Sequence, residues 1–321
     1  MKALVFNEFG GPEVLSYTEI PAPEIGSHDV LVETRAIGLN FADIYRRKGN
    51  YHLVGKPPFI LGYEGAGVVV ETGADVTSLK PGDAVAFADA PHANAEFVAV
   101  HEDHAIPLPH DISFETAASV MLQGLTAQYL THDSHSVEKG QTILVHAAAG
   151  GVGQLLTGIA KHKGAYVIGL TSSEEKRMTA LKAGADEVFL YSGSWTDEVL
   201  EFTGGRGVDA AYDSIGSTLM DSFLCTRERG TVVFYGMAGG DPAPVDPRML
   251  MDTSKTLTGG DLWSYLTSRE ERLSRSEGLF ELIRSGAVKL APPTLFKLKD
   301  GAGAHRLIES RKSSGKILLI P

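Results

Sequence analysis

Three small residues at fixed spacing, Ala148, Gly150 and Gly153, form the pattern in this sequence that most directly indicates chemistry. In a G-x-G-x-x-G frame, the first small residue makes a tight turn, the second lets the backbone approach a pyrophosphate, and the third lets a helix pack closely on a strand. The flanking sequence predicts a buried strand over residues 142–147 and an amphipathic helix that continues to about Lys163. Because the N-terminus of such a helix presents free N–H groups and a positive dipole end, the pattern predicts a site for dinucleotide phosphates.

The end of the next predicted strand, residues 165–170, indicates which nicotinamide cofactor is preferred. NAD sites place Asp or Glu there to bind the ribose 2′-OH, whereas this chain has Thr171, Ser172 and Ser173. Hydroxyls and the following Lys176 suit a 2′-phosphate, which a carboxylate would repel, so we predict NADPH rather than NADH. Alternatively, Ser172 only caps the next helix and Lys176 is a solvated surface lysine. Capping and phosphate binding are compatible.

Charge and composition narrow the class of protein. The 321 residues carry a formal net charge of −11, which disfavours nucleic acid or an anionic membrane as the main partner. No apolar run approaches the ~20 residues of a membrane span, and the N-terminal segment lacks the features of a signal peptide. Cys225 is the single cysteine, which excludes an intramolecular disulfide and a thiolate-rich zinc site. We therefore expect a cytoplasmic protein with a small-molecule substrate.

The elements that must position these residues follow two patterns. Up to about residue 122, short β-branched runs bounded by Pro, Gly and Asp turns predict a small, twisted, barrel-like domain. From Gln141, strands alternate with helices, which predicts an α/β doubly wound parallel sheet whose ligands lie beyond the carboxyl ends of the strands. The strands are expected near residues 142–147, 165–170, 187–191, 208–213, 231–236 and 255–260, and the helices include 174–183 and 217–228.

The chain as a whole resembles the medium-chain dehydrogenase/reductase superfamily and, within it, the zinc-independent quinone oxidoreductases. The motifs that carry the resemblance are FGGPEVL (9–15), AIGLNFAD (36–43), LGYEGAG (61–67), KPGD (80–83), QGLTA (123–127), HAAAGGVG (146–153) and DSIG (213–216). The resemblance implies a GroES-like twisted β-barrel catalytic domain over residues 1–122 and 287–321, and a Rossmann NADPH-binding domain over residues 123–286. It also implies a site between the two domains and a homodimer or larger assembly.

Two positions separate this chain from the zinc-dependent members of the superfamily. Those enzymes place a cysteine where Asn40 stands and a histidine where Tyr63 stands. A catalytic zinc site needs three protein ligands, and Glu64 alone cannot supply them. The pairs His101/His104 and His132/His135 lack a helical H-E-x-x-H frame, so we interpret them as surface histidines and predict no metal.

Without a metal, the protein must position the hydride, exclude water and stabilise the negative charge that develops on the acceptor. Candidate side chains are those of Asn40, Asp43, Tyr45, Arg46, Tyr51, Tyr63 and Thr126. The resemblance implies that Asn40, Tyr45 and Tyr51 line the catalytic site near the nicotinamide. Asn40 could donate an amide hydrogen bond, and Tyr51 is either a proton or hydrogen-bond donor or an aromatic lid. No sequence context marks an indispensable general acid, which leaves water as a proton source.

For the cofactor, the resemblance implies a set of contacts spread over several loops. These are Thr126, Ala149, Gly150, Gly151, Val152, Ser172, Lys176, Tyr191, Ser214, Tyr235, Gly236 and Lys316. Residues 150–152 would face the pyrophosphate, Ser172 and Lys176 the 2′-phosphate with Tyr191 alongside, and Ser214 with the turn at 235–237 the ribose and nicotinamide. Tyr191 could instead be an ordinary tyrosine at a strand end, and Lys316 a surface lysine.

The expected activity is NADPH-dependent reduction of quinones or of α,β-unsaturated carbonyls such as enones and 2-alkenals. A metal-free alcohol dehydrogenase is disfavoured, because alkoxide formation normally uses the zinc. A third alternative is a cofactor-binding structural protein, as in the lens crystallins of this family. The physiological substrate, and one-electron against two-electron quinone reduction, remain open.

One segment bears on assembly. Residues 255–262 are expected to form the outer strand of the parallel sheet and to leave an edge that can pair with another chain. Pairing of two such edges across a twofold axis gives a closed assembly, so we predict a homodimer.

Overall fold

A computed structural model describes residues 1–321 and shows two compact units. The first comprises Met1–Leu122, Leu266–Glu277 and Ala291–Pro321, and the second Gln123–Tyr265 and Gly278–Leu290. The division after residue 122 coincides with the expected domain boundary. The expected boundary between residues 286 and 287 differs from the structure, because the second unit continues to Leu290. The structure also assigns Leu266–Glu277, which includes the first part of α8 (Arg269–Arg284), to the first unit.

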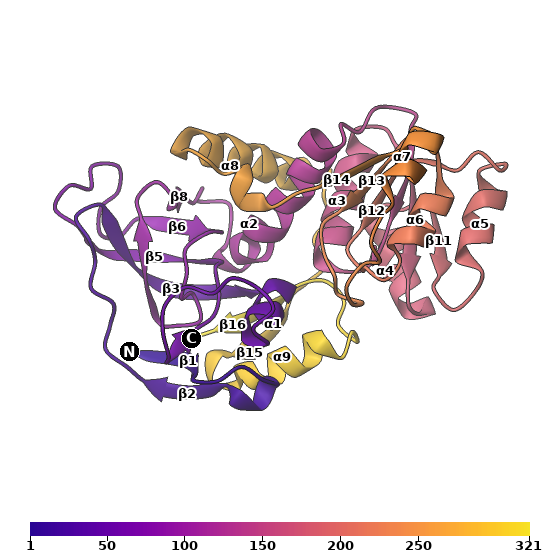
Figure 1. Cartoon of the computed structure of the whole chain (residues 1–321). Coiled ribbons are helices and arrows are strands. Elements are labelled where there is room, and N and C mark those ends of the chain that lie inside the picture. Colours follow the sequence, from indigo (N-terminus) through magenta and orange to yellow (C-terminus); the bar gives the residue numbers. More distant parts are fainter. The chain divides into compact units, whose positions relative to one another are not determined.

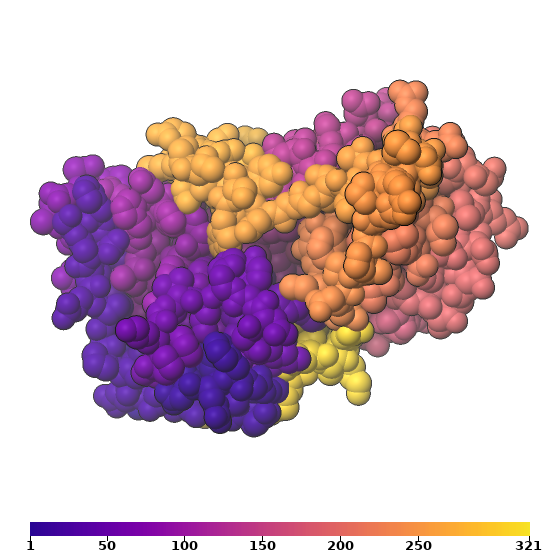
Figure 2. All heavy atoms as spheres, viewed as in Figure 1, coloured from indigo at the N-terminus to yellow at the C-terminus, as the bar shows by residue number.

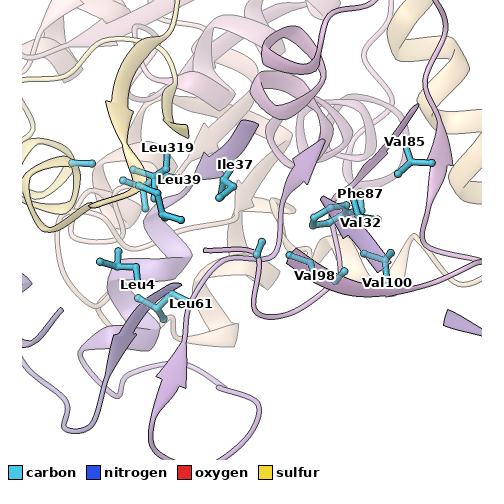
Figure 3. Packing of buried hydrophobic residues seen from close by; sticks show 14 of the residues in the cluster. Leu4, Val32, Ile37, Leu39, Leu61, Val85, Phe87, Val98, Val100 and Leu319 are labelled. Carbon is cyan, nitrogen blue, oxygen red and sulfur yellow. The ribbon is translucent and has the colours of Figure 1, made fainter. Parts of the chain in front are cut away.

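The first unit is built on the long strand β3 (Asp29–Leu39), which pairs with three other strands. The larger sheet runs in the order β15 (Thr294–Lys297), β16 (Ile317–Ile320), β3, β5 (Gly65–Thr72), β6 (Ala84–Phe87), β8 (Ile106–Pro107), with β7 (Phe97–His101) on β3. A smaller sheet joins β2 (Ser16–Glu19), β1 (Lys2–Phe6) and β4 (Phe59–Ile60). Apolar side chains from both sheets, including Leu4, Ile37 and Leu319, meet in one buried cluster (Figure 3).

The last strand, β16, completes this unit from the far end of the sequence. It runs antiparallel to β3, with Ile317 opposite Leu39 and Leu319 opposite Ile37. Figure 1 shows this yellow C-terminal strand among the indigo and purple elements of the N-terminal part. The pairing places residues just before β16 next to the end of β3, where α1 (Phe41–Arg47) begins.

The second unit contains a six-stranded sheet in which all strands are parallel. Their order is β11 (Glu187–Leu190), β10 (Tyr166–Thr171), β9 (Thr142–Val145), β12 (Val208–Asp213), β13 (Thr226–Phe234) and β14 (Thr256–Gly259). Each lies within a few residues of its expected position, and the predicted doubly wound parallel sheet is confirmed for this unit. Because β9 sits in the middle, the order reverses there, where ligands of such sheets bind.

The helices of this unit pack against the sheet strands. They include α3 (Gly151–His162), α4 (Glu174–Ala183), α5 (Trp195–Phe202) and α6 (Leu219–Cys225). The expected helix over 217–228 was too long, because residues from Thr226 onward pair with β12 instead. The ion pair between Arg227 and Asp209 holds this early part of β13. The space-filling view shows that side chains fill the gaps between the ribbons on the face in view (Figure 2).

The remaining helices are α2 (Phe114–Tyr129), α7 (Pro247–Thr253) and α9 (Gly301–Glu309), with a π-helical turn over Leu130–Ser134. The sequence patterns indicated neither α1 nor α9. In the structure, no helix has the length and apolar character needed to cross a membrane.

Candidate active site and cofactor-binding loops

The glycine-rich turn joins β9 to α3 in the geometry that a phosphate site requires. Gly150 is the N-cap of α3, and its N–H donates to the carbonyl oxygen of Ala147 at 2.7 Å. A Cβ atom at Gly153 would overlap the backbone of Ala147, and one at Gly151 would overlap the amide of Gln123. The left-handed residue is Ala147, with φ of 47°, one position before the tight turn expected at Ala148. Glycine at positions 151 and 153 therefore lets the turn pack closely on its neighbours, and the free N–H groups at the N-terminus of this 12-residue helix suit a pyrophosphate.

The loop after β10 carries the residues expected at the 2′-phosphate. The N-cap of α4 is Ser173, whose hydroxyl accepts from the backbone N–H of Lys176 at 3.3 Å. Ser172 is exposed and is not the cap, so the alternative interpretation of Ser172 as a helix cap is wrong by one position. The structure thus brings Ser172 and Lys176 to one strand–helix junction with no carboxylate between Thr171 and Ser173.

The carboxyl ends of β12 and β13 bring together the expected ribose and nicotinamide contacts. Tyr235 donates its backbone N–H to the carbonyl oxygen of Asp213 at 3.0 Å, and its hydroxyl hydrogen-bonds Ser214. A Cβ atom at Gly236 would crowd the backbone of Ser214 at 3.2 Å. Burial raises the pKa of Tyr235, so its phenol stays protonated. Ser214, Tyr235 and Gly236 therefore form one surface at the end of the sheet.

Two of the expected cofactor residues have surroundings that their sequence context did not show. The hydroxyl of Tyr191 accepts the backbone N–H of Ala147 at 3.0 Å and lies 3.1 Å from Nδ1 of His146. Burial raises the pKa of this phenol, with the Ala147 N–H acting against the shift. Thr126 is half-buried in α2. Their contacts with the cofactor stay predictions.

In the first unit, Lys316 is buried rather than on the surface, with 4% of its area exposed. Its ammonium lies 2.5 Å from Oε2 of Glu64 and donates to Oδ1 of Asn40 at 2.9 Å. Asn40 in turn donates its amide to the same Glu64 oxygen at 2.8 Å, and Oε1 of Glu64 accepts the N–H of Leu122 at 2.7 Å. In this cluster, Asn40 stands where the resemblance implies a cysteine in the zinc-dependent members of the superfamily.

The side chains of this cluster do not fit a zinc ion. Glu64 is the one carboxylate there, and it already faces the ammonium of Lys316. Asn40 and Tyr63 supply neither thiolate nor imidazole, the ligands that zinc prefers. Nowhere in the chain do three His, Cys, Asp or Glu side chains converge as a metal site would need.

Beside this cluster, a buried arginine contacts the rings of Tyr63 and Tyr51. The guanidinium of Arg46, 1% exposed, lies 3.9 Å from the ring centre of Tyr63 and 5.0 Å from that of Tyr51. Its Nε donates to the carbonyl oxygen of His52 at 3.1 Å, which fixes the loop carrying Tyr51. The ring of Tyr45 packs edge-on against Tyr51 at 6.5 Å. Tyr45 and Tyr51 are therefore brought together.

Asp43 has a structural role at the N-terminus of α1. Its Oδ2 accepts the backbone N–H of Asn40 at 2.9 Å, which caps α1. Burial raises the pKa of Asp43, and the nearby Arg46 opposes that rise. Asp43 is therefore a structural hydrogen-bond partner at the start of α1.

The histidine pairs that we interpreted as surface residues make local contacts. His104 lies 3.0 Å from Asp89, and His101 lies 3.7 Å from Asp103. Nδ1 of His132 lies 2.8 Å from the carbonyl oxygen of Gln128, and His135 contacts Gln141 at 3.2 Å. The histidine that sequence reasoning missed is His146, which lies buried directly before the glycine-rich turn. Its place inside the HAAAGGVG motif was the available signal.

Comparisons with known proteins match the whole chain. A family profile described as "Alcohol dehydrogenase GroES-like domain" matches residues 26–142, and one described as "Zinc-binding dehydrogenase" matches residues 151–274. A quinone oxidoreductase of Pseudomonas aeruginosa is 40% identical over 100% of this chain and 99% of its own length. A 2-haloacrylate reductase of a Burkholderia species is 38% identical over 99% and 98%. The crystal structure of Escherichia coli quinone oxidoreductase complexed with NADPH superposes with a TM-score of 0.95 at 37% identity, covering 100% of both chains.

Full-length relatives at this identity share a fold and a family, and the expected GroES-like and Rossmann-type units are those that the structure contains. The predicted resemblance is therefore confirmed: the chain belongs to the quinone oxidoreductases of the medium-chain dehydrogenase/reductase superfamily.

Proposed function

We propose that this chain is an NADPH-dependent, zinc-independent reductase that transfers a hydride to quinones or related conjugated carbonyls. The observation that carries the cofactor choice is the junction after β10, where Thr171, Ser172 and Ser173 follow one another without a carboxylate and Lys176 lies in the first turn of α4. The NADPH in the crystal structure of the Escherichia coli relative supports this choice. The glycine cradle at residues 150–153 fits the pyrophosphate that NADPH and NADH share.

When bound, NADPH supplies the hydride. The residues of this chain hold the phosphates, orient the nicotinamide with the surface formed by Ser214 and Tyr235, and stabilise the acceptor oxygen. Because quinones and enones already accept hydride readily, positioning and a hydrogen bond to the developing anion are enough. Tyr51 is the candidate donor, because the stack with Arg46 and Tyr45 holds its ring in place.

Tyr51 has two possible roles, and one substitution separates them. Tyr51→Phe keeps the ring and removes the hydroxyl. If the phenol donates to the acceptor, kcat should fall about tenfold to a hundredfold with little change in KM for NADPH. An unchanged kcat would assign Tyr51 to substrate packing alone.

The cation of Lys316 supports a metal-free mechanism. It places a fixed positive charge beside Glu64, where relatives that use zinc bind the metal, and so leaves no uncompensated carboxylate to attract one. The second acceptor class, conjugated carbonyl compounds, is favoured by the relative named 2-haloacrylate reductase.

The test is a screen of NADPH oxidation with simple quinones, enones, 2-alkenals and alcohols, before and after dialysis against EDTA. We expect turnover with quinones or enones and no loss after chelation. Loss that zinc restores would contradict the metal-free proposal. Binding of NADPH without turnover of any acceptor would favour the crystallin-like structural alternative.

We also propose that the protein is a cytoplasmic homodimer that pairs through β14. This strand is the last in its sheet and hydrogen-bonds β13 alone, which leaves one edge available. The single cysteine, Cys225, is buried and unpaired, which suits a reducing compartment.

A further inference from the structure

A group of buried polar side chains lies under the glycine-rich turn of the second unit. His146, Asp213 and Ser222 have no exposed area, and Tyr191 and Trp195 stand over the imidazole with ring centres 5.8 and 5.3 Å away. None of these three buried side chains can reach a substrate. Because burial of unpaired polar groups is costly, the group must be held by its internal hydrogen bonds.

The donor and acceptor of each hydrogen bond can be assigned in turn, starting from the carboxylate of Asp213. Burial lowers the pKa of His146, so the imidazole is neutral. Burial acts to raise the pKa of Asp213, but the hydrogen bonds that its carboxylate accepts keep that pKa below its usual value. Ser222 lies 2.7 Å from Oδ2 of Asp213, and a carboxylate can only accept, so the serine hydroxyl donates its one proton there. The 2.9 Å contact between Ser222 and Nε2 of His146 then requires Nε2 to carry the proton.

The same reasoning continues to the turn. With its proton on Nε2, His146 must accept at Nδ1, and the hydroxyl of Tyr191 is the donor at 3.1 Å. That hydroxyl can then accept the backbone N–H of Ala147 at 3.0 Å. Three side chains, those of Ser222, His146 and Tyr191, therefore connect the Asp213 carboxylate to one peptide N–H through hydrogen bonds that all run in one direction.

The peptide at the end of this chain is a strained one. Ala147 has a left-handed φ of 47°, a conformation that residues with a Cβ rarely adopt. Its carbonyl oxygen accepts the N–H of Gly150, the N-cap of α3. The conformation of Ala147 thus decides where the first free N–H groups of α3 point.

The other oxygen of Asp213 acts on a second loop. Oδ1 accepts the backbone N–H of Ile215 at 2.8 Å and of Gly216 at 3.0 Å, which holds the turn that carries Ser214. One carboxylate therefore holds the loop expected at the nicotinamide directly and the pyrophosphate loop through three side chains.

We propose that Asp213, Ser222, His146 and Tyr191 are positioning residues that form one directional hydrogen-bond chain and set the pyrophosphate cradle. Tyr191 acts through the Ala147 peptide and not as a ligand of the 2′-phosphate. This inference rests on the proposed function of the turn as the dinucleotide site.

The test compares NADPH and NADH on the full-length protein by calorimetry. Tyr191→Phe keeps the ring and leaves the Ala147 N–H and His146 Nδ1 unpaired. Because the pyrophosphate is common to both nucleotides, the Kd of both should rise by the same factor, about tenfold. KM for NADPH should rise in parallel, and kcat at saturating NADPH should stay unchanged.

Two further variants separate positioning from a general loss of structure. Ser222→Ala breaks the chain at a site with no exposed area and should raise both Kd values in the same direction. In the double variant with Tyr191→Phe, each Kd should rise by less than the product of the two single-variant factors, because the chain is already broken. Thr131→Val is the matched control: Thr131 also has no exposed area and donates its hydroxyl to the carbonyl oxygen of Ala127 at 2.8 Å, but it lies outside the chain, so both Kd values should stay unchanged.

A rise for NADPH alone in Tyr191→Phe would show a direct 2′-phosphate contact and overturn the inference. Unchanged Kd values with a lower Tm would reduce the chain to a stabilising role and would also overturn it. Binding of NADPH by the unaltered protein tests the proposed function separately, and failure there would remove both proposals.

Discussion

Lys176 lies in the first turn of α4, directly after two acids, Glu174 and Glu175. Acids at a helix N-terminus stabilise the helix through its dipole, but they also repel a phosphate that approaches the same end. Lys176 is the cation placed to offset them at the 2′-phosphate, while Arg177 is engaged with Glu187 at 3.4 Å.

Lys176→Ala should therefore weaken NADPH binding by about 1–3 kcal/mol, the range for a hydrogen bond to a charged group, and leave NADH binding nearly unchanged. Lys182→Ala, on the exposed last turn of the same helix, is the control and should alter neither. Titration of both nucleotides by fluorescence measures the effect. Equal losses for the two nucleotides would place Lys176 at the shared pyrophosphate and not at the 2′-phosphate.

Lys316 poses a different problem, because its charge is buried. Lys316→Met keeps the long apolar stem but leaves the Glu64 carboxylate buried without a cation. The free energy of unfolding should fall by about 3–5 kcal/mol, and the added change Glu64→Gln should recover part of it. Urea unfolding measures both, with exposed Lys299→Met as the control. A loss below about 1 kcal/mol would mean that water reaches Glu64. The nucleotide affinity of the same variant tests the predicted cofactor contact of Lys316.

Among the elements, α9 is attached to α1 by a buried histidine. Nδ1 of His305 lies 3.3 Å from the guanidinium of Arg47, and Arg47 also binds Glu309 at 2.7 Å. Burial, with the Arg47 charge second, lowers the pKa of His305 from 6.5 to about 3. The folded state therefore keeps this imidazole neutral where the unfolded chain protonates it.

The consequence is a pH dependence with a definite sign. Between pH 6.5 and about 3, the unfolded state binds one more proton than the folded state, so stability falls as the pH falls through this window. His305→Asn cannot titrate and should reduce the slope by up to about 1.4 kcal/mol per pH unit. Urea unfolding at about pH 4 and about pH 7 gives the slope for both proteins, and exposed His110→Asn is the control. Parallel slopes for the parent and His305→Asn would show that His305 is protonated in the folded state.

At the scale of the whole molecule, the open edge of β14 predicts the assembly. Leu257 pairs with Val232 of β13 in this edge strand. A proline there removes a backbone donor and disturbs the strand, so Leu257→Pro should shift a dimer toward monomer. The matched control is Leu295→Pro in β15, which is an edge strand of the larger sheet of the first unit. Leu295 is 56% exposed, and this variant should leave the mass unchanged. Light scattering at micromolar concentration measures both. A monomeric parent protein would contradict the predicted dimer. A Leu257→Pro variant that remains dimeric would show that the interface lies outside β14.

Local patterns predicted the second unit well, because the residue patterns that specify its strands, turns and helices each extend over a short stretch of chain. A strand, a glycine-rich turn and a helix follow one another within 142–162, and each alternation of strand and helix repeats that logic. The end of α6 shows where local rules fail: residues 226–228 look helical, but pairing with β12 and the Asp209 ion pair make them a strand. Secondary structure there depends on a neighbour, not on the segment's own residue types.

The partners of side chains likewise divide into those that are close in the sequence and those that are far apart in it. Ser172 and Lys176 are four residues apart, so a short pattern places them together. Lys316 and Asn40 are 276 residues apart, and β16 alone, by pairing with β3, brings the ammonium to the amide. His146 and Ser222 are 76 apart and meet because β9 and β12 are neighbours in the sheet. Composition and spacing identify which residues can do chemistry, whereas burial and strand order establish which partners they have, because both depend on contacts between distant segments.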